Sequence, residues 1–242
     1  RENPGGFLTS DCRGNLRRLH EDFSKKHNGL KLRMGTEPEM MWLKFDENGK
    51  PKDGFSKPYC YHIDQFESLR PVYMKVMEYS RAMGLDMIQG DHEDAPGQIE
   101  LNWMFDDVLR NADRLSTYRQ ICAQVAREFG IFACFMSKPF MGVSANGCHH
   151  NMSLWRGGED VFQKTGNDPK SLPGMKENYM YVKGGDNTFM PDGDDVQMPQ
   201  KAGLEAIGGI VHHLQALTAI GCSTVNSYRR LWDTGFWAPV FA

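Results

Sequence analysis

The sequence predicts an α+β fold, in which antiparallel strands and amphipathic helices share a core. Apolar residues recur at helical spacing in some segments, while shorter segments alternate or are continuously apolar, as strands are. Turn residues such as Pro-Gly and Asn-Gly join these segments. Of the 242 residues, 40% are hydrophobic, which is enough for a core and excludes a disordered chain.

The helices are predicted from apolar spacing and from their end signals. Ser10 and Asp11 open the first with capping side chains, and Gly84 and Gly130 follow the ends of two others. The predicted helices span 10–27, 66–83, 106–129 and 201–220.

The strands are predicted between turns. A long strand, or a pair of strands, ends at the turn over 46–49, and two short strands surround the turn at 96–97. The predicted strands span 31–44, 85–90, 98–104, 131–136 and 148–155. Residues 156–200 are rich in glycine, asparagine, aspartate and proline, so a long surface excursion is expected there.

Charge and cysteine content narrow the class of protein. With 28 Lys and Arg against 31 Asp and Glu, the net charge of -3 argues against a protein that binds nucleic acid or an anionic membrane. No apolar run is long enough to span a bilayer, and no signal-like segment opens the chain. The six cysteines are scattered without a CxxC motif, which favours reduced thiols and a cytoplasmic location.

Glutamates flank a proline in the first predicted strand. Side chains alternate along a strand, so Glu37 and Glu39 point to the same face on either side of Pro38. Two carboxylates on one face repel each other unless a cation lies between them. The alternative is a pair of solvated side chains on an edge strand that tolerates proline, and this segment alone favours that alternative.

A second acidic segment surrounds the turn at 96–97. The turn would bring Glu93 and Glu100 near each other, with the imidazole of His92 beside them. Carboxylates and an imidazole at neighbouring strand ends suit Mg²⁺ or Mn²⁺, which prefer hard ligands. A polar hairpin tip without a metal explains this segment equally well.

A third segment combines a histidine with neutral polar groups. Alternation places His149, Asn151 and Ser153 on one face, and Cys148 and His150 on the other. The first face offers one imidazole and two hydrogen-bonding groups. A zinc site on the second face is disfavoured because the chain has no matching Cys/His pair, and a lone histidine is more often a satisfied core residue.

A fourth segment, 224–231, carries arginine after what is predicted to be a buried strand. Such an arginine is either a surface cation or a clamp for a carboxylate or a phosphoryl group. The sequence contains neither the P-loop motif nor the dinucleotide-binding glycine motif, and it lacks the GxSxG motif of serine hydrolases.

Taken in order, the motifs resemble the catalytic domain of glutamine synthetases, from about Ser10 to the last residue. They read GTEPEMMWL, DHEDAPGQIELN, ACFMSKPF with NGCHHNMSLW, and GGIVHHLQALTAI with TVNSYRRL and APV. The segment Lys57–Tyr61, the HEDA sequence and the Trp-Ala-Pro ending are most similar to the branch of glutamate–methylamine ligases and type III-like enzymes. The resemblance implies a split barrel of antiparallel strands with outer helices, incomplete at both ends.

The resemblance also implies two sets of metal ligands. Glu39, Glu93 and Glu100 match the three glutamates that hold the metal nearer the glutamate substrate. Glu37 and His149 match two ligands of the metal nearer the phosphates of ATP. Two sites for Mg²⁺ or Mn²⁺ are therefore expected.

Other positions match residues that contact the substrates. Arg230 matches the catalytic arginine that binds the substrate glutamate, and Gly147 and His149 belong to the same part of the site. Asn151 and Ser153 match positions on the ATP side.

The implied reaction joins an amine to the γ-carboxylate of L-glutamate. The carboxylate attacks the γ-phosphate of ATP to give γ-glutamyl phosphate, and the amine then displaces phosphate. Two divalent cations offset the repulsion between carboxylate and triphosphate. The amine implied is ammonia or a small alkylamine such as methylamine, and the implied assembly is a homo-oligomer, a dodecamer built from rings.

Three positions depart from the family pattern. Asn151 replaces a histidine that usually touches ATP phosphate, and Ala145 replaces a glycine in the loop before the histidine. Trp237 stands where ammonia-using enzymes carry an acidic residue that takes the proton of ammonium. An indole cannot act as a base, and an aromatic wall suits an alkylated amine, so this position favours an alkylamine acceptor.

The resemblance also leads to an expected domain organisation. Residues 1–9 are expected to be the remnant of a linker from a missing N-terminal β-grasp domain, and residues 10–242 a partial catalytic domain that is inactive alone. The alternatives are a glutamine synthetase that uses ammonia, an impaired homologue that binds glutamate or nucleotide, and a structural barrel with solvated carboxylates. The intact set of five metal-ligand positions argues against the impaired homologue.

Overall fold

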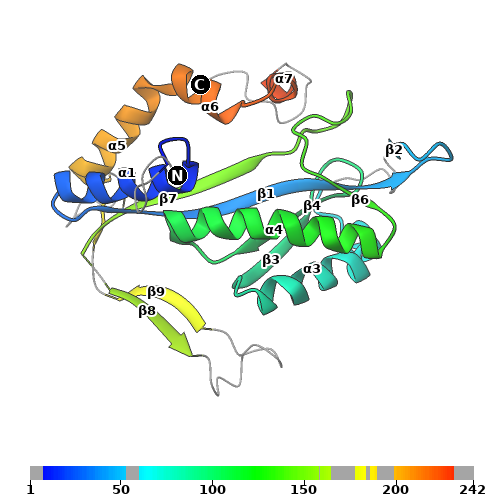
Figure 1. The fold of residues 1–242 in the computed structure, drawn as a ribbon, viewed down its shortest axis with the longest axis horizontal. Coiled ribbons are helices and arrows are strands. Elements are labelled where there is room, and N and C mark those ends of the chain that lie inside the picture. The colour runs from blue at the N-terminus through cyan, green and yellow to red at the C-terminus, as the bar shows by residue number, and fades with distance from the viewer. Residues whose placement is uncertain are drawn as a thin grey trace. The chain divides into compact units, whose positions relative to one another are not determined.

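The computed structural model describes residues 8–52, 60–157, 159–164, 178–183, 186–189 and 199–231, with the backbone alone for 159–164 and 178–183 (Figure 1). The helices are α1 (Cys12–Lys26), α2 (Ile63–Ser68), α3 (Arg70–Ala82), α4 (Val108–Glu128), α5 (Lys201–His212), α6 (Leu214–Gly221), α7 (Val225–Tyr228) and the 3-10 helix η1 (Arg229–Leu231). The strands are β1 (Lys31–Phe45), β2 (Pro51–Lys52), β3 (Met87–His92), β4 (Gln98–Trp103), β5 (Asp106–Asp107), β6 (Phe132–Cys134), β7 (Cys148–Arg156), β8 (Glu159–Lys164), β9 (Asn178–Lys183) and β10 (Asp186–Asn187).

The chain divides into two compact units, which are described separately. Unit 1 comprises Arg1–Gly35, Phe105–Asp113 and Asn151–His212. Unit 2 comprises Thr36–Met104, Arg114–His150 and His213–Ala242. None of the helices described here is long and apolar enough to cross a membrane.

In unit 1, α1 begins where the sequence predicts it. The side chain of Asp11 accepts hydrogen bonds from the backbone N–H groups of Arg13 and Gly14, both at 3.1 Å. Arg13 also donates to both carboxylate oxygens of Asp113, at 2.7 and 2.9 Å. These contacts cap the helix and attach it to the first turns of α4.

The segment 156–200 is not wholly irregular. Strands β8 and β9 form an antiparallel hairpin, with Glu159 opposite Lys183 and Lys164 opposite Asn178, and β10 pairs with the end of β7. The rest of the expected excursion lies outside the described residues. Gly-rich composition therefore led sequence reasoning to overlook these three strands.

Unit 2 is built on an antiparallel sheet in which β4 lies between β1 and β3. Alternate residues of these strands turn one face toward α3 and α4 to form the core (Figure 1). That face carries the fully buried residues Met40, Trp42, Ile99, Leu101 and Trp103. Each such side chain stabilises the fold by roughly 1.5–3 kcal/mol. The residues between them on the same strands, which include Glu39 and Glu100, point to the opposite face.

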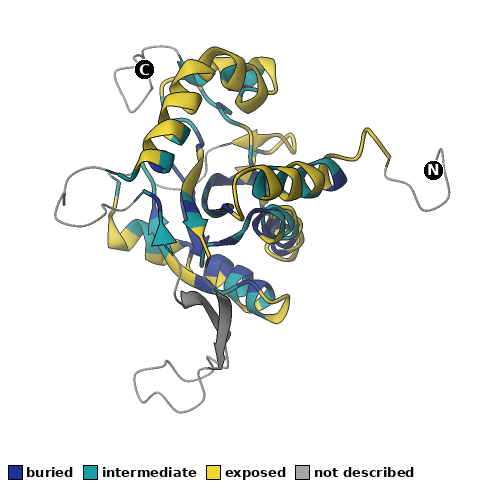
Figure 2. Ribbon diagram, turned by 90° about the vertical axis from the view of Figure 1, so that its left-hand side faces the viewer, coloured by how far each residue is buried: buried dark blue, intermediate teal, exposed yellow. Residues whose placement is uncertain are grey.

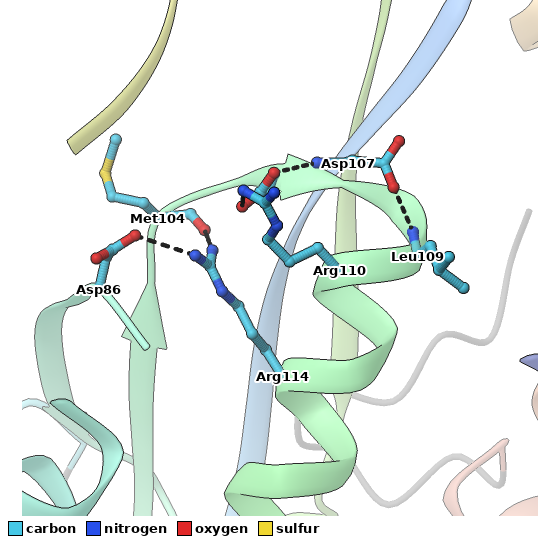
Figure 3. A network of polar contacts seen from close by, with 7 residues as sticks. Asp86, Met104, Asp107, Leu109, Arg110 and Arg114 are labelled. Atoms are coloured by element: carbon cyan, nitrogen blue, oxygen red, sulfur yellow. Dashed lines mark hydrogen bonds and ion pairs between the residues drawn. The ribbon is translucent and has the colours of Figure 1, made fainter. Parts of the chain in front are cut away.

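A buried ion pair attaches α4 to the segment before β3 (Figure 3). Arg114 donates to the carboxylate of Asp86 at 3.0 Å and to the backbone carbonyl of Met104 at 3.2 Å. The two charged side chains are 8% and 13% exposed, so removing either one would leave an uncompensated charge in the interior.

Three predicted elements differ from the structure. The predicted helix 66–83 is two helices separated at Leu69, because Pro71 lacks an N–H group and restricts the residue before it. The predicted helix 201–220 ends at His212 and restarts at Leu214, and no proline marks that break. The segment after Thr224 is the short helix α7, and not the predicted strand, since Thr224 caps a helical turn.

Helices α5 and α6 each leave most of their residues exposed (Figure 2). In α5, Ile207, Ile210 and Val211 are exposed apolar side chains, and in α6, Leu217 and Ile220 are exposed. Their apolar periodicity therefore predicts the helices correctly, although it does not indicate burial in the part of the chain that the structure describes.

Candidate functional site

A pocket of about 450 Å³ opens in unit 2, on the face of β1 and β4 that is opposite α3 and α4. Six carboxylates and two permanent cations are among the groups that line it. The lining residues are Glu37, Glu39, Cys60, Tyr61, Gln89, Asp91, Glu93, Asp94, Gln98, Glu100, Lys138, Ser144, Ala145, His149 and Arg230.

Strand register brings two predicted metal ligands together. Glu39 of β1 lies directly opposite Glu100 of β4, and Asp91 of β3 lies on the other side of Glu100. Like charges directly opposite each other destabilise a sheet. The two acidic segments of the sequence therefore meet at one place, and that place holds an excess of negative charge.

The carboxylate of Glu39 is held on one side by fixed donors. Its Oε2 accepts hydrogen bonds from the backbone N–H of Gly147 at 2.7 Å and from Nε2 of Gln98 at 3.0 Å. Its Oε1 lies 3.1 Å from Nε2 of His149. The side chain of Glu39 is 13% exposed, so its orientation is set by protein groups more than by solvent.

Burial and mutual repulsion perturb the other two glutamates. Burial raises the pKa of Glu93 to about 8, and the charges of Glu39, Glu100 and Asp91 add to that effect. Burial likewise raises the pKa of Glu100 to about 7, although a hydrogen bond of 2.7 Å from Asn102 opposes the change. Such shifts mark groups whose charged form lacks compensation, and they are typical of functional sites.

His149 lies against this cluster, beside Glu39. Its hydrogen bond with Glu39 raises its pKa, and burial opposes that effect. The side chain is 56% exposed, so the imidazole can turn away from Glu39 at little cost.

A short loop before β7 closes one side of the pocket. The amide nitrogen of Gln98, 1% exposed as a residue, lies 3.1 Å from the carbonyl of Ala145 and 3.0 Å from Oδ1 of Asn146. Ser144 donates a hydrogen bond to the carboxylate of Asp94. The hairpin of β3 and β4 and this loop thus share one network of hydrogen bonds.

Two basic side chains, Lys138 and Arg230, also line the pocket. Arg230 donates to the carbonyl of Asn146 at 3.1 Å. Lys138 is 2% exposed, and burial, together with the charge of Arg230, lowers its pKa. The pocket therefore contains both acidic and basic side chains, which suits a ligand that carries charges of both signs.

The chemical type of the donors fits a hard divalent cation. Carboxylate oxygens with one imidazole are the ligands that Mg²⁺ and Mn²⁺ accept, and a cation would relieve the repulsion around Glu93 and Glu100. Within the described part of the chain, however, no group of three or more His, Cys, Asp or Glu side chains is arranged so that it could hold a metal ion. Glu39 and His149 pair with each other instead, so binding would require these side chains to reorient.

The remaining predicted site residues are not among those that line the pocket. Gly147 is beside Glu39, and its carbonyl accepts a hydrogen bond from the backbone N–H of Glu39 at 3.1 Å. Asn151 and Ser153 belong to β7 in unit 1, where Oγ of Ser153 accepts a hydrogen bond from the indole of Trp155 at 2.9 Å. Their role on the ATP side stays a prediction. Trp237 lies outside the described residues.

Sequence reasoning missed several polar residues of the pocket. Gln98 has the same strand parity as Glu100, so alternation alone would have placed it on the same face. Lys138 and Tyr61 carry no comparable signal, because loops connect them to the sheet. Tyr61 has a φ of 61°, which a non-glycine residue rarely adopts, and the charge of Glu93 raises its pKa.

Comparison with curated proteins relates most of the chain to proteins named as glutamine synthetases and a glutamate–methylamine ligase. The chain is 34% identical over 221 residues to a glutamine synthetase of Rhizobium leguminosarum bv. phaseoli. It is 32% identical over 216 residues to a glutamate–methylamine ligase of Methyloversatilis universalis. The two alignments cover 89% and 86% of this chain but 43% of each relative, so the chain spans less than half the length of these relatives.

Solved structures agree with this relationship. GmaS solved without ligand matches with a TM-score of 0.69 and 31% identity, over 90% of this chain and 45% of that one. The cryo-EM structure of Plasmodium falciparum glutamine synthetase matches with a TM-score of 0.70 over 93% of this chain and 44% of that one. At 22% identity the second similarity concerns the fold alone, and it confirms the predicted class of helices around a curled antiparallel half-barrel sheet.

A family match covers almost the whole sequence. The family described as "Glutamine synthetase, catalytic domain" matches residues 9–180 and 174–242. These ranges include each acidic segment of the pocket and Arg230. The chain therefore belongs to the glutamine synthetase family, through its catalytic domain.

Proposed function

We propose that the full-length protein is an ATP-dependent ligase that joins an amine to the γ-carboxylate of L-glutamate. The observation that carries the proposal is the pocket itself, in which Glu37, Glu39, Glu93, Glu100 and His149 line one cavity with Arg230. These residues come from segments that are distant in the sequence, and a structural barrel with solvated carboxylates would have no reason to gather them in one pocket. Assembly into a ring of subunits stays a prediction.

The basic and the acidic side chains of the pocket suit a carboxylate of glutamate and a divalent cation, respectively. Arg230 presents a planar fork of N–H donors that can bind a carboxylate of glutamate in a bidentate manner. The carbonyl of Asn146 orients that guanidinium through the hydrogen bond of 3.1 Å. In the same pocket, Glu39, Glu93 and Glu100 would hold one divalent cation, and Glu37 with His149 a second.

In the proposed reaction, a γ-carboxylate oxygen attacks the γ-phosphorus of ATP, the bond to the β-phosphate oxygen breaks, and ADP leaves. The amine nitrogen then attacks the acyl carbon, phosphate leaves, and the nitrogen loses its extra proton. Bound divalent cations would neutralise the charge of carboxylate and triphosphate and align the displacement. In this proposal, Arg230 fixes a carboxylate of the substrate, and the pocket limits the access of bulk water to Glu39, Glu93 and Glu100.

The identity of the amine is tested with the full-length protein. Phosphate release is measured with ATP, glutamate and either methylamine, ethylamine or ammonia at equal concentrations of the free base. Trp237 favours faster turnover with methylamine than with ammonia, because an aromatic wall suits an alkylated amine better than ammonium. Equal or faster turnover with ammonia would support the alternative, a glutamine synthetase. Phosphate release with none of the amines would contradict the ligase proposal.

Gly147→Ala is expected to weaken binding of Mn²⁺ by at least about tenfold while changing stability little. A Cβ atom at this position would lie 2.7 Å from Nε2 of His149 and 2.8 Å from Oε1 of Glu39, so one of these groups must move. His149 is exposed enough to yield, and its displacement would move a proposed metal ligand from its present position beside Glu39. Titration calorimetry with Mn²⁺ measures the effect.

A matched control for this substitution is available in α5. Gly208→Ala adds the same methyl group where no atom lies within 4 Å, and alanine favours a helix over glycine by about 1 kcal/mol. Affinity for Mn²⁺ should therefore stay at the wild-type value in this variant. Unchanged affinity in Gly147→Ala as well would argue against the proposed ligand set.

A further inference from the structure

We propose that Asn226 is a positioning residue, whose side-chain amide attaches the loop 137–147 to α7 and so fixes Arg230 at the pocket. The inference rests on the proposed function, since it assigns to Asn226 the orientation of the group that binds glutamate. All the residues involved belong to unit 2.

Asn226 satisfies both backbone groups of one distant residue. Its Oδ1 accepts a hydrogen bond from the N–H of Lys138 at 2.7 Å, and its Nδ2 donates to the carbonyl of Lys138 at 2.8 Å. The two residues are 88 positions apart in the sequence. An asparagine amide used in this way imitates one rung of a β-ladder, with a donor and an acceptor matched at the same time.

The attachment matters because few other contacts hold α7 in the part of the chain that the structure describes. The helix has four residues, which is too short to be stable by itself. Its two large apolar side chains are exposed, Val225 by 83% and Tyr228 by 45%, so apolar burial contributes little. Besides Asn226, the buried Ser227 contacts the loop, with its Oγ 3.3 Å from Oγ of Ser137.

The orientation of Arg230 depends on the same loop, which Arg230 contacts from the helical turn after Asn226. It lies in η1, four residues after Asn226, and donates to the carbonyl of Asn146 at 3.1 Å. Asn146 is itself fixed, since its Nδ2 donates to the carbonyl of Met136 at 2.9 Å. Among the described residues, the loop is therefore attached to the α7–η1 segment at Ser137, Lys138 and Asn146. With both hydrogen bonds of Asn226 lost, only the contacts of Ser227 and of Arg230 itself would join this segment to the loop in that part of the chain.

The same attachment sets the spacing of the two cations in the pocket. Lys138 and Arg230 both line it, and Asn226 holds the backbone of the first while it precedes the second by one helical turn. None of the hydrogen bonds described for Asn226 involves a proposed metal ligand, and the loop's own hydrogen bond to Glu39 comes from Gly147, nine residues after Lys138. Loss of the amide should therefore affect binding of glutamate more than binding of the metal.

Asn226→Ala in the full-length protein is expected to raise KM for glutamate by about tenfold or more, since small displacements of a positioning group have effects of this size. The affinity for Mn²⁺ should stay within about twofold of wild type. Asn226→Asp keeps the acceptor for the N–H of Lys138, so its KM for glutamate should lie between the values of the wild type and of Asn226→Ala. Asn48→Ala, at an exposed turn after β1, is the matched control and should behave as wild type.

A double-mutant cycle distinguishes positioning from general support. If Asn226 acts through Arg230, Asn226→Ala should add little to the change in KM caused by Arg230→Lys. Additive effects, a comparable loss of Mn²⁺ affinity, or an unchanged KM would each overturn the inference.

A separate readout covers the case in which the wild-type protein shows no glutamate-dependent phosphate release, which would refute the proposed function. Hydrogen exchange of the amides in the loop 137–147 is then compared between Asn226→Ala and Asn48→Ala. Faster exchange in the first variant alone supports the attachment, because the N–H of Lys138 loses its acceptor. Equal exchange overturns it.

Discussion

Glu93→Gln is expected to abolish binding of Mn²⁺ and ligase activity while making the metal-free protein more stable at pH 8. The wild-type carboxyl has a pKa of about 8 in the folded protein, chiefly because of burial and then because of the charge of Glu39. In the unfolded chain its pKa returns to about 4.5, the reference value. Glutamine keeps the shape of the side chain and removes the charge that the fold disfavours.

The direction of the stability change follows from proton uptake. Between pH 4.5 and 8 the folded protein holds a proton on Glu93 that the unfolded chain has lost, so wild-type stability falls as pH rises through this range. The gain from Glu93→Gln should be absent near pH 4.5 and complete above pH 8. After allowance for solvent screening, it should be on the order of 1–2 kcal/mol.

Urea unfolding of the metal-free protein at pH 5.5 and pH 8 measures the gain. Glu47→Gln, on the exposed turn after β1, is the matched control and should give no gain at either pH. If Glu93→Gln is less stable than the wild type at pH 8, the fold does not disfavour the charge of Glu93. If the variant still binds Mn²⁺, Glu93 is not a ligand of the metal.

Binding of Mn²⁺ to the wild-type protein is expected to release protons and to strengthen as pH rises from about 6 to 8. In the metal-free pocket Glu93 has a pKa of about 8 and Glu100 of about 7, so at pH 7 the first is mostly protonated and the second about half protonated. A metal requires both as carboxylates. Between one and two protons should therefore leave at pH 7, and fewer above pH 8.

Calorimetry in buffers of different ionisation enthalpy counts these protons directly. Glu100→Gln should both weaken binding and lower the count, whereas Glu47→Gln should change neither. Binding without proton release at pH 7 would mean that the ion is held by groups other than these two glutamates.

Strand alternation is a local property, so the sequence alone can predict which carboxylates share a face. Glu37 and Glu39 share a face whatever the rest of the chain does, and the turn at 96–97 places Glu93 near Glu100. Each segment alone had a polar explanation that was at least as good. The order of the motifs related the segments to one family, and the register of Glu39 opposite Glu100 explains physically why their carboxylates lie together.

The parts that sequence reasoning missed depend on contacts between distant segments. Gln98 and Asn226 are ordinary amides in the sequence, and their importance comes from partners 48 and 88 residues away. The break of the predicted helix 201–220 at His213 has no proline to signal it. Loop residues such as Lys138 lack periodicity, so no pattern indicates where their side chains point.

Both faces of β4 are buried, and this limits which insertions the sequence can accept. Ile99, Leu101 and Trp103 fill the core, while Gln98, Glu100 and Asn102 face away from it. A shift of β4 by one residue relative to β1 and β3 would exchange the two sets. The carboxylate of Glu100 would then lie in the core, and the apolar side chains would line the pocket. Insertions of a single residue in the hairpin should thus be lost from any library of variants, since one error would destroy folding and chemistry together.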